Sequence, residues 1–404
     1  MPHPADSTDR TRWAMLLALV SGFALSQAFR TVAAIMAPPL QAEFHLTPSQ
    51  LGVFAGAFHF AFGGLQLFMG MGMDLWGPRR TVLVVSPLTI VGAVVAATAH
   101  AYPQLILGQV IIGIGCAPAF LACTIAVSRW FEPHRFAAVN GAAMGIGTVG
   151  LLATGTPLAW LIEQWSWRAG FLALAVAAVG AWLAIFLLVR DGHQHADGAP
   201  ARPLDALRGY GELLRLPFTW GIVVLALFTY ASFLTFRGLW LGPLLVERHG
   251  FSLVQTGNVA LVFSFLSAFG PPLYGRIDPG DARRRHWLFW YTLGFGALFV
   301  VMALTRSVIV DLLAGAVVMI LCGYMVMQYA DVRAAYPARL IGRAMALFTM
   351  ALFMGVALMQ WITGLVASAA PALGMETYQA VLGSIAVLLV GAAIAFRLLP
   401  APRR

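Results

Sequence analysis

Residues 13–40 read WAMLLALVSGFALSQAFRTVAAIMAPPL, an apolar run that contains no acidic residue and a single base, Arg30. The hydrocarbon core of a bilayer is about 30 Å thick, and a helix of about 20 apolar residues crosses it. The run is too long for the hydrophobic region of a signal peptide, and no small-residue cleavage site follows it. We therefore predict that it forms the first membrane-spanning helix.

The same apolar character extends along the whole chain, whose 404 residues are 60% hydrophobic and only 10% charged, with 41 glycines. This composition excludes an ordinary soluble protein. Lipid offers no water to an open strand edge, so each long apolar stretch is expected to be a helix. We predict twelve spans, at residues 13–38, 48–72, 80–100, 103–127, 138–162, 168–189, 219–246, 252–275, 286–304, 307–330, 342–367 and 376–397.

A polar segment with glycine and proline, residues 190–217, divides these spans six and six. It predicts a linker between an N-terminal bundle, residues 1–189, and a C-terminal bundle, residues 218–404. The predicted fold class is an all-α membrane protein with twelve transmembrane helices in two pseudo-symmetric six-helix bundles.

All 25 basic residues are arginines, and their distribution predicts the orientation of the chain. If the N-terminus is cytoplasmic, 20 of them fall in tails and loops on that side and three, Arg168, Arg248 and Arg306, fall on the other. This asymmetry predicts a multi-pass protein of the cytoplasmic (inner) membrane with both termini inside. The formal charge of +9 is then mainly an orientation signal, so the expected partner is the bilayer and not a nucleic acid.

Two segments repeat one pattern in the two halves. Residues 29–52 read FRTVAAIMAPPLQAEFHLTPSQLG and residues 236–257 read FRGLWLGPLLVERHGFSLVQTG. Each contains Phe-Arg, then a proline, an acid, a Ser or Thr and a Gln-x-Gly. Internal repeats of this kind characterise secondary transporters, whose substrate site lies at the repeat interface near the bilayer midplane.

With these features the chain resembles the major facilitator superfamily over nearly its whole length. The loop at residues 70–80, GMGMDLWGPRR, is similar to the superfamily's Gly-x-x-x-Asp-Arg-x-Gly-Arg-Arg signature, and it differs in having Leu75 in place of the base and an inserted Pro78. The resemblance implies that this loop gates the bundles from the cytoplasm and that the two halves rock about a central cavity. The matching positions are Gly70, Asp74, Gly77, Arg79 and Arg80.

The two arginines inside predicted spans, Arg30 and Arg237, occupy equivalent places in the repeat. A charged side chain at the bilayer centre costs roughly 2.5–3.5 kcal/mol, yet none of the 16 acids falls near a helix centre to offset it. A substrate carboxylate or phosphate would supply the missing anion. The alternative is structural: each arginine caps carbonyls at a broken helix or extends its head group to the outer surface.

The surroundings of Arg30 resemble the organic-anion branches of that superfamily, the organophosphate:phosphate antiporters and the anion:cation symporters. In those branches an arginine on the first helix is followed eight residues later by proline, which here is Pro38. The antiporters also carry an arginine on the seventh helix, which Arg237 matches in residue type and helix. The resemblance implies transport of an organic anion, either a phosphate or a carboxylate.

Helical spacing adds further candidates for substrate binding. Tyr230, Phe233, Arg237 and Trp240 follow one another at i, i+3, i+7 and i+10, which predicts one shared face. Gln27 is expected beside Arg30, and Tyr324 and Gln360 are candidate hydrogen-bonding groups. His59 is the one histidine inside a span, and it is either a proton-coupling group or a neutral side chain bonded to a neighbouring helix.

The chain shows no nucleophile elbow, phosphate loop or metal-spaced cluster, so we predict a transporter and not an enzyme, with no metal and no organic cofactor. The predicted function is secondary active transport of a small organic anion by alternating access, with Arg30 and Arg237 on the anionic group and with protons or a counter-anion as coupling partner. We expect a monomer. Two alternatives are a drug or metabolite exporter of the same superfamily and a transporter-like anion receptor.

Overall fold

The computed structural model describes residues 9–132, 135–190, 210–337 and 340–402, and within them twelve helical spans are long and apolar enough to cross a membrane. All twelve predicted spans are thereby confirmed. Their bounds are Asp9–Phe44, Pro48–Met73, Leu75–Ala97, Tyr102–Trp130, Val139–Gln164, Trp167–Leu188, Pro217–Arg248, Leu253–Arg276, Asp281–Leu304, Val308–Ala335, Ile341–Leu373 and Thr377–Leu398.

Several spans are built from shorter helices joined at kinks. The first half of the chain contains α1 (Asp9–Phe44), α2 (Pro48–Gly64), α3 (Gln66–Val85), α4 (Pro87–Ala97), α5 (Tyr102–Cys116), α6 (Ala119–Trp130), α7 (Phe136–Gly147), α8 (Val149–Ala153), α9 (Thr156–Gln164) and α10 (Trp167–Leu188). The second half contains α12 (Pro217–Thr235), η3 (Phe236–Trp240), α13 (Leu241–Pro243), η4 (Leu244–Arg248), α14 (Leu253–Ser267), α15 (Gly270–Arg276), α16 (Asp281–Leu304), α17 (Val308–Leu321), η5 (Cys322–Tyr324), α18 (Met325–Ala335), α19 (Ile341–Ala369), η7 (Ala370–Leu373) and α20 (Thr377–Leu398).

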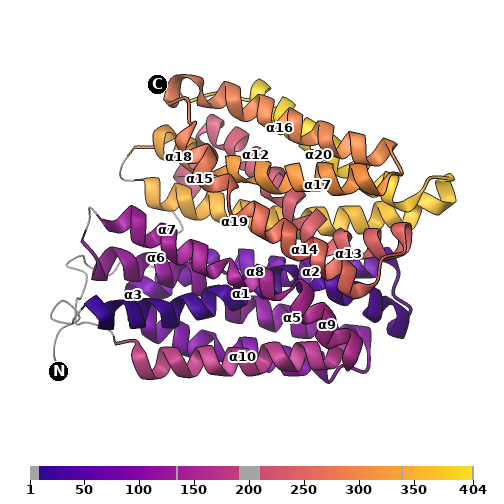
Figure 1. Ribbon diagram of the computed structural model, residues 1–404. Helices are drawn as coiled ribbons and strands as arrows, with labels where there is room; N and C mark the ends of the chain where they lie inside the picture. The colour runs from indigo at the N-terminus through magenta and orange to yellow at the C-terminus, as the bar shows by residue number, and fades with distance from the viewer. Residues whose placement is uncertain (1–8, 133–134, 191–209, 338–339, 403–404) are drawn as a thin grey trace.

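The helices of the first half lie together on one side of the molecule, and those of the second half lie on the other (Figure 1). The start of α1 and the end of α20 lie at the same end of the helix stack, which we call the termini side, and the opposite end is the far side. Of the predicted linker, residues 191–209 lie outside the described part of the chain.

The sequence pattern that is repeated in the two halves has a structural basis at the starts of α2 and α14. Each helix begins with a capping box. The N-cap hydroxyl accepts a hydrogen bond from the backbone N–H three residues later, and the glutamine at that later position accepts one from the backbone N–H of the N-cap residue. In α2 the Gln50 N–H donates to the Thr47 hydroxyl at 3.3 Å, and in α14 the Gln255 N–H donates to the Ser252 hydroxyl at 3.1 Å. The repeated Ser/Thr and Gln therefore fix the same helix start twice.

Glycines bring the two halves into backbone contact at the far side. A Cβ built on Gly242 would lie 1.6 Å from the Ala34 carbonyl oxygen, and one on Gly52 would lie 2.3 Å from that of Gln360. These positions place η3 and α13 against α1, and α2 against α19. Residues without a side chain are what allow helix backbones to approach so closely in a membrane.

Hydrogen bonds between the halves reinforce the same region. The Ser49 N–H donates to the Ser368 hydroxyl at 2.9 Å, and the Thr156 hydroxyl donates to Asn258 Oδ1 at 2.6 Å. Together with the glycine contacts, these bonds form what we call the far-side seal, the packing of α1 on η3 and α13, of α2 on α19 and of α9 on α14. The described conformation is therefore closed at the far side.

Gly242→Ala is expected to destabilise this closed conformation, because its new methyl group has no room beside the Ala34 carbonyl. Overpacking of this kind costs typically about 1–3 kcal/mol, and the melting temperature of the purified protein should fall. Gly391→Ala is the matched control, since a Cβ at Gly391 meets no atom within 4 Å. Equal melting temperatures for the two variants would contradict the close approach.

Candidate functional site

Arg30 lies in α1, where its side chain bonds along its own helix and also reaches Tyr230 of α12. Its Nη1 donates to Gln27 Oε1 at 2.6 Å, and its Nη2 donates to the Ser26 hydroxyl at 3.4 Å. The Nε of Arg30 is buried and has no hydrogen-bond partner among the described residues. The guanidinium therefore keeps donor capacity that the protein does not use.

Two aromatic rings, one from each half, enclose the Arg30 guanidinium. Its central carbon lies 4.6 Å from the centroid of Phe62 on α2 and 4.7 Å from that of Phe353 on α19, and these two rings contact each other edge to face. Such contacts are worth about 0.5–2 kcal/mol each. Tyr230 of α12 also lies close enough to interact electrostatically with Arg30, so both halves contribute to its surroundings.

Exposure changes sharply along α1 at Arg30. Gln27, one turn toward the termini side, is half-buried, whereas Arg30 is 5% exposed and every residue from there to Ala37 is buried. Tyr230 is also half-buried. The Arg30 guanidinium is therefore enclosed in this conformation, and the nearest partly exposed residue of α1 lies toward the termini side.

Arg237 lies in η3 and bonds in a different direction from Arg30. Its Nε and Nη2 donate to the Ser264 hydroxyl of α14 at 3.3 and 3.0 Å, and its Nη2 also reaches the Leu151 carbonyl oxygen of the first half at 3.5 Å. Its Nη1 is buried without a partner among the described residues. The backbones of the two arginine segments are adjacent, because a Cβ on Gly238 would lie 3.1 Å from the Arg30 carbonyl oxygen.

The carbonyl of Leu151 accepts these bonds because the fifth span is broken just after it. The Gly155 N–H, which would complete the helix by bonding to Leu151, bonds to the Leu152 oxygen at 3.0 Å. The Thr154 hydroxyl donates to the Leu151 oxygen at 3.0 Å, and Ser264 does so at 3.4 Å. Arg237 thus helps to cap a broken helix of the opposite half, which is the structural alternative that the sequence left open.

The predicted shared face of Tyr230, Phe233, Arg237 and Trp240 has different neighbours along its length. Tyr230 contacts Phe233 and also packs against Phe353 of α19. The Trp240 indole N–H donates to the Thr363 hydroxyl, also on α19, at 2.9 Å. Arg237 instead reaches Ser264 of α14 and Leu151 of the first half, from within the π-helical turn Phe236–Trp240, which has more residues per turn than an α-helix.

The other candidates fall into two groups. His59 of α2 and Gln360 of α19 are 1% and 0% exposed and lie close enough to interact with each other, and His59 also interacts electrostatically with Arg30. Tyr324 instead bonds to Thr292 at 3.1 Å and packs against aromatic rings of the second half. The structure thus gathers Arg30, Gln27, Tyr230, His59 and Gln360, while the contacts of Tyr324 and Trp240 lie elsewhere.

Neither Arg30 nor Arg237 forms an ion pair within the part of the chain that the structure describes. The acids that pair do so near the helix ends, as Glu43 does with Arg168 and Asp311 with Arg248. This arrangement agrees with the expectation that no carboxylate lies near a helix centre.

Comparison with known proteins decides the family. The profile described as Major Facilitator Superfamily matches residues 19–279, well over half of the chain. The chain belongs to the Major Facilitator Superfamily. It is therefore a transporter-family protein with a multi-pass membrane fold, as the sequence predicted, and it is not classed with enzymes.

Relatives of this superfamily member include transporters of organic anions. This chain is 24% identical over 262 residues to "Probable sulfoacetate transporter SauU" of Cupriavidus necator, and the matched region covers 61% of this chain and 60% of that protein. It is 25% identical to the D-galactonate transporter of Escherichia coli over 97% of this chain and 98% of that protein. In structure it resembles a bacterial homologue of the human lysosomal transporter Spinster, with a TM-score of 0.76, 19% identity and 97% of each chain covered, which shows the shared fold.

The superfamily signature loop joins the second and third spans at the termini side. Gly77 has φ 80°, a conformation that glycine adopts readily, and it produces the kink inside α3. Arg79 donates to the Val189 and Phe186 carbonyl oxygens at 2.5 and 3.0 Å, at the end of α10. Gly70 has open space around it and Arg80 is exposed, while the side chain of Asp74 lies outside the described part of the structure.

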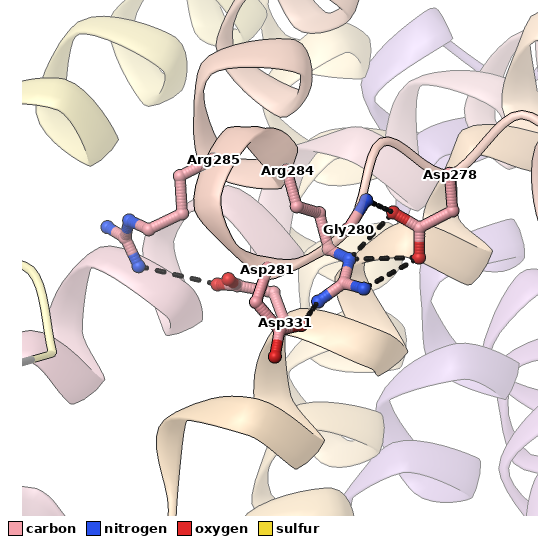
Figure 2. A network of polar contacts seen from close by, with 6 residues as sticks. All are labelled: Asp278, Gly280, Asp281, Arg284, Arg285 and Asp331. Carbon is pink, nitrogen blue, oxygen red and sulfur yellow. Dashed lines mark hydrogen bonds and ion pairs between the residues drawn. The ribbon is translucent and has the colours of Figure 1, made fainter. Parts of the chain in front are cut away.

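A second loop of the same kind, at residues 275–285, escaped the sequence analysis although Gly275, Asp278, Gly280 and the pair Arg284 and Arg285 repeat the signature's residue types. Figure 2 shows its network: Arg284 bonds to Asp278 at 2.7 Å and to Asp281, and Arg285 pairs with Asp331 at 3.3 Å. The Arg284 hydrogen bonds hold the pKa of the Asp278 carboxyl below its ordinary value.

Arg285 also repeats the contact made by Arg79. It reaches the Phe396 carbonyl oxygen of α20 at 3.5 Å and stacks over the Phe396 ring at 4.0 Å, just as Arg79 bonds to Phe186 and lies 5.9 Å from its ring. In each half, an arginine at the start of the third membrane span is thus bonded to the end of the sixth span, α10 or α20.

Ser264→Ala is expected to lower the melting temperature, because it removes the two hydrogen bonds that the Arg237 guanidinium makes to that hydroxyl and leaves a buried charge less satisfied, at a cost of about 1–3 kcal/mol. Ser267→Ala is the control, since among the described residues the Ser267 hydroxyl bonds to a carbonyl of its own helix. If both substitutions change the melting temperature by the same amount, the Arg237 contact contributes nothing.

Proposed function

We propose that this protein is a secondary active transporter that moves a small organic anion across the cytoplasmic membrane by alternating access, with Arg30 binding the anionic group. The observation that carries the proposal is the Arg30 guanidinium itself. It is buried among residues of both halves, keeps an unpartnered Nε and has no carboxylate paired with it in the described chain.

A guanidinium presents donors in a planar arrangement that matches a carboxylate or a phosphate. Around Arg30, Gln27 and Tyr230 add polar groups, and Phe62 and Phe353 add apolar surface. Such a mixture suits a small organic anion that has an apolar part. The relatives named for sulfoacetate and D-galactonate, both organic anions, support this class of substrate.

Alternating access assigns a different task to Arg237. Its bonds to Ser264 and to the Leu151 carbonyl join the two halves beside the far-side seal. Opening the far side separates the halves and must break the bond to Leu151. We therefore assign Arg30 to the substrate and Arg237 chiefly to the closed far-side state, with the loops around Arg79 and Arg285 holding each half together as it moves.

The two alternative functions make different demands on the same site. An exporter of cationic drugs requires an acid near the cavity, whereas the residues recorded around Arg30 are aromatic and uncharged polar groups. An anion receptor would bind substrate without accumulating it. Uptake into vesicles separates a receptor from a transporter.

Arg30→Gln is expected to abolish binding and uptake of the anion that stabilises the native protein. A panel of carboxylates, sugar phosphates, inorganic anions and organic cations, tested by thermal shift, identifies that anion, because a ligand of the native state raises the melting temperature by mass action. Uptake of the same anion is then measured in proteoliposomes. Loss of one charge-assisted interaction in a buried site should weaken binding at least about tenfold.

The control is Arg306→Gln, which makes the same charge change at an exposed arginine of the far side. It should bind and transport as the native protein does. Stabilisation by cations only, unaffected by Arg30→Gln, would contradict the proposal and favour an exporter. An imposed pH gradient in the same vesicles distinguishes proton coupling from exchange for a counter-anion.

The proposed orientation places the termini side in the cytoplasm, on the strength of the arginine distribution. Single cysteines introduced at Arg306 on the far side and at Arg397 on the termini side of a variant lacking native cysteines test it in intact cells. A membrane-impermeant thiol reagent should label the first position and spare the second. The reverse labelling pattern would show the opposite orientation.

A further inference from the structure

Three buried polar side chains meet near the centre of the molecule with unused hydrogen-bonding capacity. Neither His59 Nε2, nor Gln360 Nε2 or Oε1, nor Arg30 Nε has a hydrogen-bond partner in the described part of the chain. All three residues are at least 95% buried. Buried polar groups in native proteins are nearly always bonded, so a cluster of unbonded ones indicates a place that a ligand or water completes.

The ring of His59 is fixed as an acceptor at this place. Its Nδ1 lies 3.1 Å from the Ala55 carbonyl oxygen, one turn earlier in α2. A carbonyl oxygen can only accept, so Nδ1 carries a proton in this conformation, and in the neutral ring Nε2 then presents a lone pair. An anionic oxygen cannot satisfy that lone pair, whereas a hydroxyl can donate to it.

Gln360 offers the complementary groups on the opposite half. Its amide has an N–H₂ donor and a carbonyl acceptor, and it lies within reach of the His59 ring where α2 and α19 pack together, although neither amide atom makes a hydrogen bond of normal geometry among the described residues. A substrate hydroxyl that donates to His59 Nε2 can at the same time accept from the Gln360 amide. The pair is therefore complementary to a neutral hydroxyl group and not to a second anionic group.

The pair formed by His59 and Gln360 also lies next to the positive charge of Arg30. His59 interacts electrostatically with Arg30, and the Phe62 and Phe353 rings that enclose Arg30 come from the same two helices, α2 and α19. A hydroxyl bound by the pair would thus belong to the molecule whose anionic group is bound by Arg30.

We propose that His59 and Gln360 bind a hydroxyl group of the substrate, so that the transported anion is a hydroxylated acid and not an unsubstituted one. The inference rests on the proposed function, because it takes Arg30 as the anion-binding residue. It also changes the role of His59 from the proton-coupling candidate of the sequence analysis to a neutral acceptor that determines specificity.

The test compares pairs of anions that differ in their hydroxyls, namely lactate and propionate, D-gluconate and hexanoate, and glycerol 3-phosphate and propyl phosphate, with sulfoacetate as an additional anion that has no hydroxyl. Affinity is measured from thermal-shift titrations of the full-length protein. In the native protein at least one hydroxylated member should bind about tenfold or more tightly than its partner, because a site built to bond a hydroxyl discriminates strongly against its absence.

His59→Phe and Gln360→Met should remove this preference while leaving the affinity for the unsubstituted partner nearly unchanged. Arg30→Gln should weaken both members of the pair. Gln109→Met is the matched control, since Gln109 is also a buried glutamine with an unpartnered amide nitrogen, and it should retain the preference. His59→Gln, which keeps a hydrogen-bond acceptor, should restore part of it.

The outcomes separate this inference from the proposed function. Equal binding of both members by the native protein, with loss of both in Arg30→Gln, would overturn the hydroxyl site and leave the anion site standing. A uniform loss of affinity for both members in His59→Phe and Gln360→Met would show a structural role for the pair and would likewise overturn it. Binding of no anion, or binding unaffected by Arg30→Gln, would overturn both proposals together.

Discussion

The buried positive charge of Arg30 is the constraint around which this structure is organised. A guanidinium at this depth costs several kcal/mol unless something compensates it, and no carboxylate is paired with it in the described chain. The compensation present is partial: a bond to Gln27, two aromatic faces and a nearby phenol. Because those groups come from both halves, the environment of the charge depends on how the halves are positioned relative to each other, which is what a transporter of anions requires.

The internal repeat does not give its two arginines one function. Arg30 and Arg237 are equivalent in sequence, and their backbone segments are in contact, yet their side chains diverge. A π-helical turn changes the direction in which Arg237 points, and a break in the fifth span supplies a carbonyl that it can cap. The loops at the termini side behave in the opposite way, since Arg79 and Arg285 make matching contacts although the sequence disguises one of the loops. Symmetry is therefore kept at these loops and at the repeated Gly52 and Gly257, which both pack against the opposite half, and it is lost at the two buried arginines.

The sequence predicted more of the fold than of the site. All twelve spans were foreseen, because they follow from the cost of exposing polar groups to lipid. Helical periodicity correctly placed Gln27 beside Arg30 and Tyr230 beside Phe233. Arg237 lies inside a π-helical turn, which no local composition rule predicts, and its contacts differ from those of Tyr230 and Trp240 on either side of it.

By itself, the sequence determined that this chain is a membrane protein of two related halves and that two arginines lie buried in it, since hydropathy, charge asymmetry and repeat spacing depend on residue order alone. Only the tertiary structure decided what each buried polar group touches. Arg30, His59 and Gln360 are distant in the chain and come together because α2 packs against both α1 and α19, whereas Arg237 bonds to Ser264 of α14 and to Leu151. The physical reason is that burial is a property of a segment, whereas a binding site is a property of the directions that side chains from different segments take.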